Sequence, residues 1–239
     1  MNAHSRPLPL IVVFTRWPEP GAAKTRLAEG SSPEFAAGLY RCMVEMIVQE
    51  LRPGAGRDFR LCVYASPPER VEETGLWLFG GQLPRGVEIA AQPAGTLAER
   101  LDHISRQAHA QGTPSVIFVG TDTIDLLRWD IMQALQALKR SPAVLGPAED
   151  GGFWLLGMAF PDGTYPEGLF HEVTYSVAET TGQMEAALKR HGFSPIAPMP
   201  TRRDIDFVAD IVAQPPWAKA ELARRARAAG LSLPQLAET

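Results

Sequence analysis

The chain reads Phe14-Thr-Arg-Trp-Pro-Glu-Pro-Gly-Ala-Ala-Lys-Thr-Arg-Leu27 close to its N-terminus, and this stretch does most to indicate the fold. It follows a short apolar run, Leu10 to Phe14, that is typical of a buried strand, and it leads into a helical pattern. The loop between them carries three cations, Arg16, Lys24 and Arg26. Such a loop can hold phosphate, because its N–H groups and the positive end of the helix accept the charge while Arg or Lys neutralises the rest.

The spacing alone leaves a second interpretation open for this loop. A Pro/Gly loop after a first strand is often only a connection, and neighbouring cations are often a solvated surface. The loop is not a Walker A motif, which needs Gly directly before the Lys, where Ala23 stands. It is not a dinucleotide-binding G-x-G-x-x-G either, because Gly21 is its only glycine.

Length and composition are those of an ordinary globular protein. The chain has 239 residues, of which 45% are hydrophobic and 21% charged. This length suits one large α/β domain with a sizeable core, so we expect a flexible N-terminus over residues 1–9 and a single domain over residues 10–239. The net charge of −4 argues against general nucleic-acid binding, although it allows a local basic pocket.

The expected location is the cytoplasm. The N-terminal residues are polar and contain prolines, and the apolar run after them is far shorter than a membrane span, so we expect no secretion signal and no membrane association. Cys42 and Cys62 each lie in an apolar run without metal-site spacing. They are therefore expected to be reduced core residues.

Strands and helices alternate along the chain. Apolar runs predict strands over residues 10–14, 59–65, 87–91, 116–119, 144–145, 153–158 and 195–197. Helices are predicted to start at Pro33, after a Ser32 N-cap, and to cover residues 68–79, 96–110, 129–140, 178–191 and 216–229. This alternation indicates an α/β fold with a mostly parallel sheet, helices on both faces, and ligands beyond the carboxyl ends of the strands.

One apolar stripe is expected to orient the first long helix. Its members recur at helical spacing and are predicted to face the sheet: Phe35, Leu39, Met43, Met46, Ile47 and Leu51.

Asp122 directly follows the most strongly β-branched strand, in the sequence Gly120-Thr-Asp. A carboxylate at that position points into the ligand crevice. Its natural partner is Mg²⁺ or Mn²⁺, held by one or two carboxylates together with substrate phosphates. The alternative is that Asp122 caps the following turn, a part for which Asp125 is better placed.

A second acidic site is formed by Asp204 and Asp206. In Asp-Ile-Asp the two carboxylates could lie on one face of a strand, with Ile205 on the other. If this segment meets the Asp122 loop, carboxylates from distant points of the chain could share one metal. The alternative, equally open, is an N-cap pair for a helix that begins near Phe207.

The sequence Asp150-Gly151-Gly152 also allows two interpretations. Two glycines permit close backbone approach to a ligand, with Asp150 free to accept hydrogen bonds from hydroxyl groups. A plain hairpin turn explains the same residues, since Asp-Gly between two strands is a strong hairpin signal.

Taken together, these motifs resemble those of the DUF2064 family. The family consists of GT-A-like proteins, often described as glycosyltransferases, that are similar to the guanylyltransferases acting on phospholactate and on molybdenum cofactor. The resemblance runs from about Leu10 to about Val212 and is more specific for the fold than for the substrate. It rests on Phe14-x-Arg-x-Pro-x-Pro-Gly-x-x-Lys-Thr-Arg-Leu27, Gly120-Thr-Asp122, Leu145-Gly-Pro-Ala-Glu-Asp-Gly-Gly152 with Leu155-x-Gly157, and Asp204-x-Asp206.

The resemblance implies a nucleotide-diphospho-sugar transferase (GT-A) fold, whose mixed, mainly parallel sheet has helices on both faces and binds nucleotide in its N-terminal half. The implied nucleotide-binding residues are Arg16, Pro18, Gly21, Lys24, Thr25 and Arg26. The implied catalytic residues are Lys24, Arg26 and Asp122, with Mg²⁺ or Mn²⁺ on Asp122 and Asp206. The implied acceptor- or sugar-binding residues are Asp150, Gly151 and Gly152.

Some family motifs are changed in this chain. Arg16 replaces the usual Lys, which is tolerable for phosphate binding but not equivalent. Thr123-Ile-Asp125 replaces Cys-Pro-Asp, Gly95-Thr-Leu-Ala98 replaces Gly-Asp-Leu-Gly, and Thr174-Tyr-Ser176 replaces a Trp-Ser-Thr-like segment. The changes spare the phosphate and metal positions and therefore bear on the substrate more than on activity.

Three functions remain open from the sequence. The three cations slightly favour nucleotidyl transfer, in which a small phosphorylated acceptor attacks the α-phosphate of an NTP. The second function is glycosyl transfer from a nucleotide-sugar, and the third is non-catalytic nucleotide binding. The base, the sugar, the acceptor and the oligomeric state are not determined. The helix from Trp217 to Ala229 could pack on its own domain or on a second subunit in a homodimer.

Overall fold

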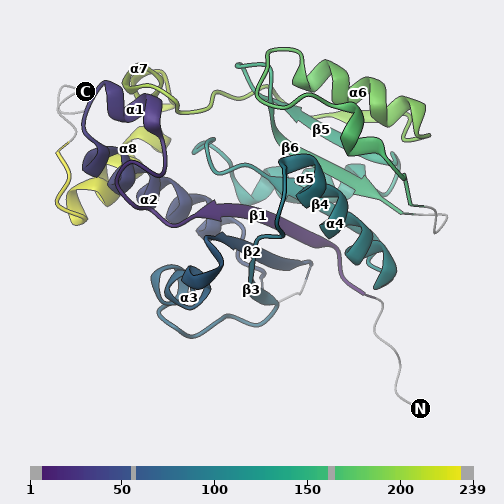
Figure 1. The fold of residues 1–239 in the computed structure, drawn as a ribbon, viewed down its shortest axis with the longest axis horizontal. Helices are drawn as coiled ribbons and strands as arrows, with labels where there is room; N and C mark the ends of the chain where they lie inside the picture. The colour runs from purple at the N-terminus through teal and green to yellow at the C-terminus, as the bar shows by residue number, and fades with distance from the viewer. Residues whose placement is uncertain (1–6, 55–57, 161–164, 233–239) are drawn as a thin grey trace.

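The computed structural model describes residues 7–54, 58–160 and 165–232, and its centre is a seven-stranded sheet (Figure 1). The strand order is β3-β2-β1-β4-β6-β5-β7. The strands are β1 (Leu10–Arg16), β2 (Arg60–Ser66), β3 (Val87–Ala91), β4 (Ser115–Val119), β5 (Ala143–Pro147), β6 (Phe153–Ala159) and β7 (Ile196–Pro198). Strand β6 runs antiparallel to β4 and β5, and the other pairs are parallel. The predicted mixed, mainly parallel sheet is confirmed.

Helices cover both faces of the sheet, as predicted. They are α1 (Thr25–Glu29), α2 (Pro33–Glu50), α3 (Val71–Phe79), α4 (Leu97–Ala110), α5 (Arg128–Ala137), α6 (Thr180–Arg190), α7 (Val208–Val212) and α8 (Pro216–Ala228). One apolar cluster joins the sheet to α2, α3 and α5, and a second joins its other face to α4 and α6. The predicted flexible segment, residues 1–9, lies mostly outside the described residues, and the single domain over residues 10–239 stays a prediction.

Local sequence signals explain where several helices begin. The Ser32 hydroxyl accepts a hydrogen bond from the Phe35 N–H at 3.1 Å, and Pro33 stands at the first helical position of α2. At the start of α4, Thr96 and Glu99 form a reciprocal capping box. These side chains satisfy backbone N–H groups that have no partner within a helix.

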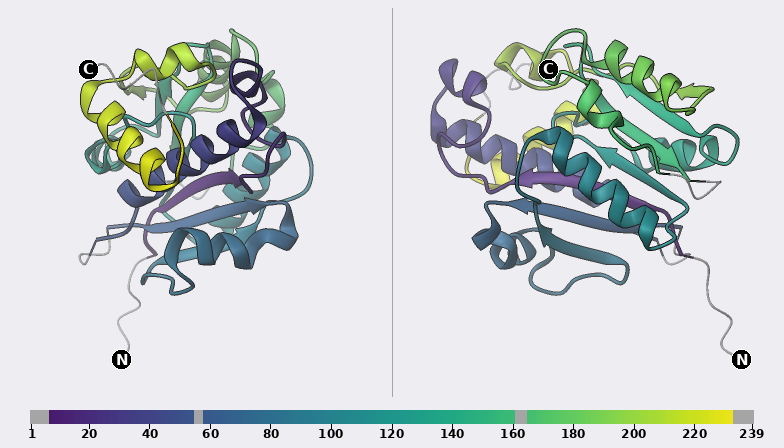
Figure 2. Two further views of the ribbon diagram at one scale, coloured as in Figure 1. Left: turned by 90° about the vertical axis from the view of Figure 1, so that its left-hand side faces the viewer. Right: turned by 45° about the vertical axis from the view of Figure 1, so that its right-hand side comes forward.

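The prediction that one stripe of α2 faces the sheet is wrong in part. Ile47 and Leu51 do pack into the cluster on the sheet. Leu39, Met43 and Met46 instead belong to a third cluster, formed with α1, α7 and α8. Figure 2 shows α1, α2 and α8 packed together at one end of the molecule. Helix α2 is therefore buried on two sides, because α8 covers the side that turns away from the sheet.

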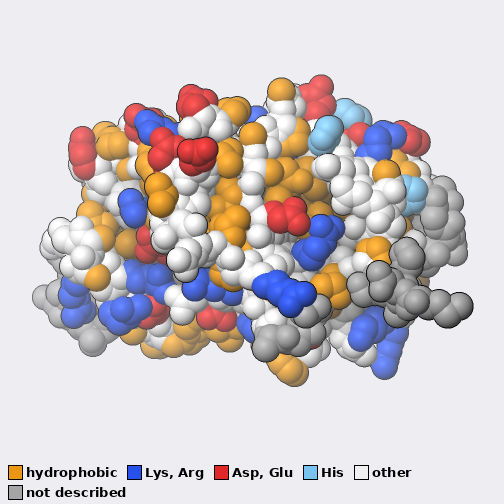
Figure 3. All heavy atoms as spheres, turned by 90° about the horizontal axis from the view of Figure 1, so that it is seen from below, with side chains coloured by type: hydrophobic (Ala, Val, Ile, Leu, Met, Phe, Trp, Pro, Cys, Tyr) orange, Lys and Arg blue, Asp and Glu red, His pale blue; other side chains and the backbone are white. Residues whose placement is uncertain are grey.

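Both cysteines are free and buried, as predicted. Burial raises the pKa of the Cys42 thiol to about 11 and that of Cys62 to about 12, so both thiols stay protonated at neutral pH. No helix among the described residues is long and apolar enough to cross a membrane. On the face seen from below, acidic and basic side chains are interspersed (Figure 3).

Candidate functional site

The candidate site lies where β1 and β4 end side by side. Because β1 leads to α1 and α2 while β4 leads to α5, the chain diverges beyond these strands, and ligands of open α/β sheets bind in such crevices. A cavity of about 320 Å³ opens there. Its lining includes six residues predicted from the sequence: Arg16, Lys24, Thr25, Arg26, Asp122 and Asp206. Tyr40 and Thr121 also line it and were not singled out from the sequence.

The basic loop is braced by its own residues. The Arg16 guanidinium donates a hydrogen bond to the Ala22 carbonyl at 2.8 Å, and the Arg16 N–H donates to the Tyr40 hydroxyl at 3.0 Å. Trp17 makes an edge-on contact with Trp77, with ring centroids 5.9 Å apart. These contacts attach the loop to α2 and α3 and hold it in a defined shape. Two predicted nucleotide-binding residues, Pro18 and Gly21, belong to this loop and are not among the cavity-lining residues.

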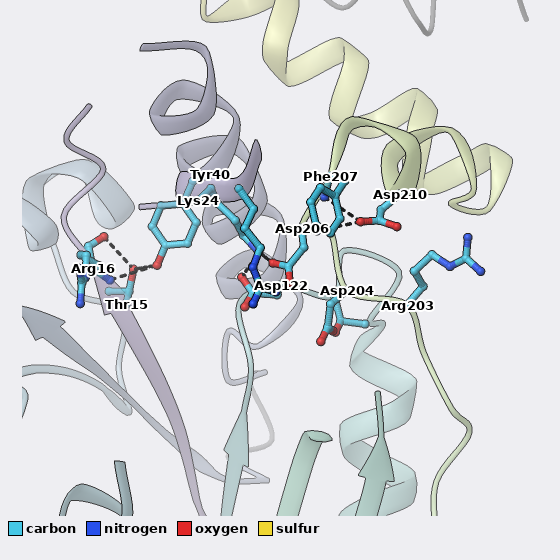
Figure 4. Close-up of polar contacts among 12 residues, drawn as sticks. Thr15, Arg16, Lys24, Tyr40, Asp122, Arg203, Asp204, Asp206, Phe207 and Asp210 are labelled. Carbon is cyan, nitrogen blue, oxygen red and sulfur yellow. Dashed lines mark hydrogen bonds and ion pairs between the residues drawn. The ribbon is translucent and has the colours of Figure 1, made fainter. Parts of the chain in front are cut away.

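Lys24 connects the basic loop to both acidic segments. Its Nζ lies 2.8 Å from Asp122 Oδ1 and 3.2 Å from Asp206 Oδ1 (Figure 4). Only 6% of the side chain is exposed. Burial alone would lower the pKa of Lys24, but attraction to Asp122 and Asp206 outweighs it and raises the pKa above its ordinary value. Lys24 is therefore a buried cation that stays charged.

Asp206 also binds the second cation of the loop, because Arg26 Nη1 lies 3.1 Å from Asp206 Oδ2. The Ile205 N–H donates to the Asp122 carbonyl at 2.9 Å, so the two acidic segments do meet. The segment from Asp204 to Asp206 is not a strand, and its two aspartates do not cap the helix that follows. Phe207 is the N-cap residue of α7, and Asp210, at the third helical position, caps the helix by accepting hydrogen bonds from the N–H groups of Asp206 and Phe207.

Asp204 is a third carboxylate on this side of the site. It accepts a hydrogen bond from the Thr123 hydroxyl at 2.7 Å. Burial raises the pKa of Asp204 to about 7; the Thr123 bond opposes this rise, and the charges of Asp122 and Asp150 add to it. The carboxyl group can therefore gain or lose a proton near neutral pH.

The loop with Asp150, Gly151 and Gly152 is the hairpin turn between β5 and β6, which agrees with the plainer of its two interpretations. Asp150 Oδ1 accepts a hydrogen bond from the Gly152 N–H at 2.8 Å. Gly151 has a φ of +91°, and a Cβ there would lie 2.1 Å from the Ala178 carbonyl oxygen. The glycine at position 151 thus lets the turn pack closely against the backbone of Ala178 and not against a ligand. The turn is not part of the cavity lining, although Asp150 is near enough to influence Asp204.

The acidic side chains suit a metal that arrives with its substrate. The described residues contain no group of three or more His, Cys, Asp or Glu side chains that could hold a metal ion. Asp122 and Asp206 nevertheless converge on one point charge, the Lys24 ammonium, which stands where a small cation would neutralise both. Mg²⁺ is commonly bound by one or two carboxylates plus substrate phosphates, so this pair fits it.

Arg202 joins the segment that carries Asp206 to the connection that carries Asp122, and sequence reasoning missed it. Its guanidinium lies 2.6 Å from Asp125 Oδ2, 2.8 Å from Asp130 Oδ2 and 4.9 Å from the centroid of the Trp154 ring. Asp125, expected to cap a turn, is thus an ion-pair partner. Asp130 caps α5 instead, by accepting a hydrogen bond from the Leu127 N–H. No local pattern around Arg202 could have indicated these partners, because they lie more than seventy residues away.

Comparison with known proteins gives these features a family context. The family model described as "Uncharacterized protein conserved in bacteria (DUF2064)" matches residues 49–177. Among solved structures, a "putative nucleotide-diphospho-sugar transferase" from Desulfovibrio desulfuricans G20 is similar with a TM-score of 0.77 and 27% sequence identity, over 95% of this chain and 97% of that one. No curated protein matches the chain.

Two more distant structures share the fold. The 4-diphosphocytidyl-2C-methyl-D-erythritol synthase of Anaerococcus prevotii DSM 20548 has a TM-score of 0.55 and 8% identity, over 92% of this chain and 100% of that one. The glucosyl-3-phosphoglycerate synthase of Mycobacterium tuberculosis, solved with Mn²⁺, UDP and glucosyl-3-phosphoglycerate, has a TM-score of 0.50 and 12% identity, over 95% of this chain and 81% of that one. At these identities the similarity concerns the fold alone.

Proposed function

Since the chain belongs to the DUF2064 family and has the fold of nucleotide-diphospho-sugar transferases, we propose that it is a metal-dependent transferase acting on a small-molecule acceptor. Its donor is an NTP or a nucleotide-sugar, and nucleotidyl transfer is the favoured reaction. One observation carries this choice: Arg16, Lys24 and Arg26 line the same cavity as Asp122 and Asp206. Three cations beside two carboxylates match a triphosphate with its metal ion.

In nucleotidyl transfer, a phosphate oxygen of the acceptor attacks the α-phosphorus of the NTP, and pyrophosphate leaves. Lys24 and Arg26 stabilise the negative charge that develops on the phosphate oxygens. Arg16 and Thr25 hold the remaining phosphates, and the Asp150 turn faces the acceptor. Mg²⁺ or Mn²⁺, held by Asp122 and Asp206, would supply further charge neutralisation. The reaction needs no nucleophile from the protein, because the acceptor provides it.

Glycosyl transfer is the second candidate, and it is supported by the description of the D. desulfuricans protein as a nucleotide-diphospho-sugar transferase. In this reaction the acceptor attacks the anomeric carbon, and a nucleoside diphosphate leaves. The same cations would stabilise the leaving diphosphate.

Product analysis separates the two reactions. The protein is incubated with Mg²⁺ or Mn²⁺, a panel of NTPs and nucleotide-sugars, and a metabolite extract as the source of acceptor. Pyrophosphate released from an NTP supports nucleotidyl transfer, whereas a nucleoside diphosphate released from a nucleotide-sugar supports glycosyl transfer. If the protein binds a donor in equilibrium dialysis but releases neither product, the result supports non-catalytic nucleotide binding.

Replacing Asp122 tests the role of the carboxylate. Asp122→Asn keeps the size of the side chain and removes its charge, so we expect turnover to fall by at least about a hundredfold while the circular dichroism spectrum stays unchanged. Asp58→Asn is the matched control, because the Asp58 side chain is 41% exposed against 45% for Asp122 and pairs with Arg128 outside the cavity. Near wild-type turnover in Asp122→Asn would show that the metal assignment is wrong.

A further inference from the structure

Lys24 is held far more tightly than Arg26, its neighbour in the basic loop. The Lys24 side chain is almost fully enclosed and bridges Asp122 and Asp206, whereas the Arg26 side chain is 64% exposed and, among the residues that the structure describes, pairs with Asp206 alone. Lys24 also has a left-handed backbone, with a φ of 51° and a ψ of 50°. This conformation is unfavourable for a residue with a Cβ and persists where the surroundings enforce it. The loop thus directs one ammonium group onto the two carboxylates.

This arrangement conflicts with simple, independent binding of metal and nucleotide. A divalent cation that approaches Asp122 and Asp206 meets the Lys24 ammonium already between them, so binding requires one cation to leave. A nucleotide phosphate that attracts Lys24 away leaves Asp122 without its cation and leaves Asp206 with Arg26 alone. Each ligand alone therefore exposes an uncompensated charge in a partly buried place, which is costly.

Binding both ligands together removes the conflict. The divalent cation neutralises the carboxylates, and the phosphates receive the ammonium that the metal has displaced. The two ligands then strengthen each other's binding, which is positive cooperativity with a favourable coupling free energy between their sites.

We propose that Lys24 is a resident cation of the site, which holds Asp122 and Asp206 in the free protein and exchanges onto the phosphates when a divalent cation and a polyphosphate enter together. The inference rests on the proposed function and adds to it a linkage between metal and donor. It also assigns Lys24 a second role: in the free protein it keeps metal out of the site. A permanent structural ion pair is the alternative, in which Lys24 never leaves the carboxylates.

The first test measures metal binding without nucleotide. Lys24→Met keeps much of the length of the side chain and removes its charge. We expect this variant to bind Mn²⁺ at least about tenfold more tightly than the wild-type protein, measured from the electron paramagnetic resonance signal of free Mn²⁺. Adding Asp122→Asn to Lys24→Met should abolish the gain. Lys189→Met, on the exposed surface of α6, is the control and should bind Mn²⁺ like the wild type. Unchanged or weaker Mn²⁺ binding by Lys24→Met overturns the inference.

The second test uses the wild-type protein and therefore does not depend on the folding of a variant. The sequence contains four lysines, Lys24, Lys139, Lys189 and Lys219, so the acetylation rate of each can be followed by mass spectrometry. Lys24 should react slowly in the free protein. Saturating Mn²⁺ should accelerate its acetylation several-fold, and Mn²⁺ with inorganic tripolyphosphate should slow it again, while exposed Lys139 and Lys189 keep their rates. A Lys24 rate that does not respond to bound Mn²⁺ contradicts the exchange.

The outcomes separate this inference from the function on which it rests. If the wild type binds Mn²⁺ together with tripolyphosphate but Lys24→Met gains no affinity for Mn²⁺, only the exchange is wrong. If neither protein binds Mn²⁺ under any of these conditions, the proposed metal-dependent function is wrong as well.

Discussion

Two separate constraints require a glycine at position 151. Its φ of +91° lies in the region that favours glycine, and the place of a Cβ is taken by the Ala178 carbonyl oxygen. The Thr181 N–H also donates to the Gly151 carbonyl at 2.9 Å. The hairpin turn is therefore locked against the start of α6, and this fixes the position of Asp150, whose charge contributes to the raised pKa of Asp204.

Gly151→Ala should lower the free energy of unfolding by about 2–4 kcal/mol, because the substitution adds backbone strain and a steric clash. Gly168→Ala is the control, since Gly168 has a similar φ of +81° but open space where a Cβ would stand. It should cost only about 1 kcal/mol. Urea denaturation of both variants measures the difference. Equal losses would show that the contact with Ala178 contributes nothing.

Single residues of the site could be identified from the sequence because they stand at predictable ends of elements. Lys24 follows the first strand, Asp122 follows the fourth, and both reach the cavity. What could not be predicted is that Lys24 and Asp206, 182 residues apart, form an ion pair. The ion pair depends on how the last segments fold back over the sheet, and no local pattern encodes that path.

At the scale of elements, α2 takes part in two apolar clusters, one on the sheet and one with α1, α7 and α8. One side rests on the sheet, and the other accepts α8 through closely packed small residues and one leucine: Ala218, Leu222, Ala223 and Ala226. Small side chains let two helices approach closely, so α8 functions as an integral layer of the fold.

Leu222→Ala should destabilise the protein by about 2–5 kcal/mol, since it removes buried methyl groups and leaves a cavity between α8 and α2. Leu76→Ala makes the same chemical change on α3, where the side chain is 61% exposed, and should change stability by less than about 0.5 kcal/mol. Thermal unfolding of the two variants tests the contrast. If Leu222→Ala unfolds like the wild type, α8 is a dispensable appendage.

Helix starts were predictable because capping chemistry is local: Ser32, Thr96 and Glu99 act as their sequence indicates. The face that each helix buries was less predictable. In a helix that is apolar on two sides, the apolar residues do not define a single face. Nothing in its sequence indicates which side packs on a sheet and which packs on another helix. This is why the Met43 side of α2 was assigned to the wrong partner.

At the scale of the whole molecule, the largely buried guanidinium of Arg202 helps to tie the C-terminal part of the chain to the centre of the sheet. Arg202 belongs to the segment after β7, while its partners Asp125 and Asp130 belong to the connection after β4. The neighbouring Arg203 pairs with Glu149 at the surface. Of these two adjacent arginines, Arg202 thus forms largely buried ion pairs and Arg203 forms an exposed one.

Replacing each arginine by Met measures this difference. Arg202→Met leaves two buried carboxylates without their cation, so we expect a loss of about 3–5 kcal/mol in unfolding free energy. Arg203→Met breaks an exposed pair and should cost no more than about 1 kcal/mol. Chemical denaturation gives both values. Similar losses in the two variants would mean that Arg202 does not hold the two parts of the chain together.

The alternation of strands and helices was enough to predict the fold class, and the hairpin was one of the two interpretations that the Asp150-Gly151 sequence left open. The strand order could not be predicted from the pattern, because the sequence of an apolar strand does not indicate which strands pair with it. The antiparallel β6 lies between β4 and β5 because the hairpin after β5 returns the chain into the sheet beside β4.

The segment after β7, through Asp206, forms one wall of the crevice, and the basic loop forms the other. The two walls come from separate parts of the chain and touch the same floor through Asp122. Because Lys24 and Arg26 pair with Asp206 across the crevice, a change at any of these three charges disturbs both walls at once. The Asp150 turn stands outside these ion pairs and outside the cavity lining, so it can change over evolutionary time while the charges of the crevice stay the same.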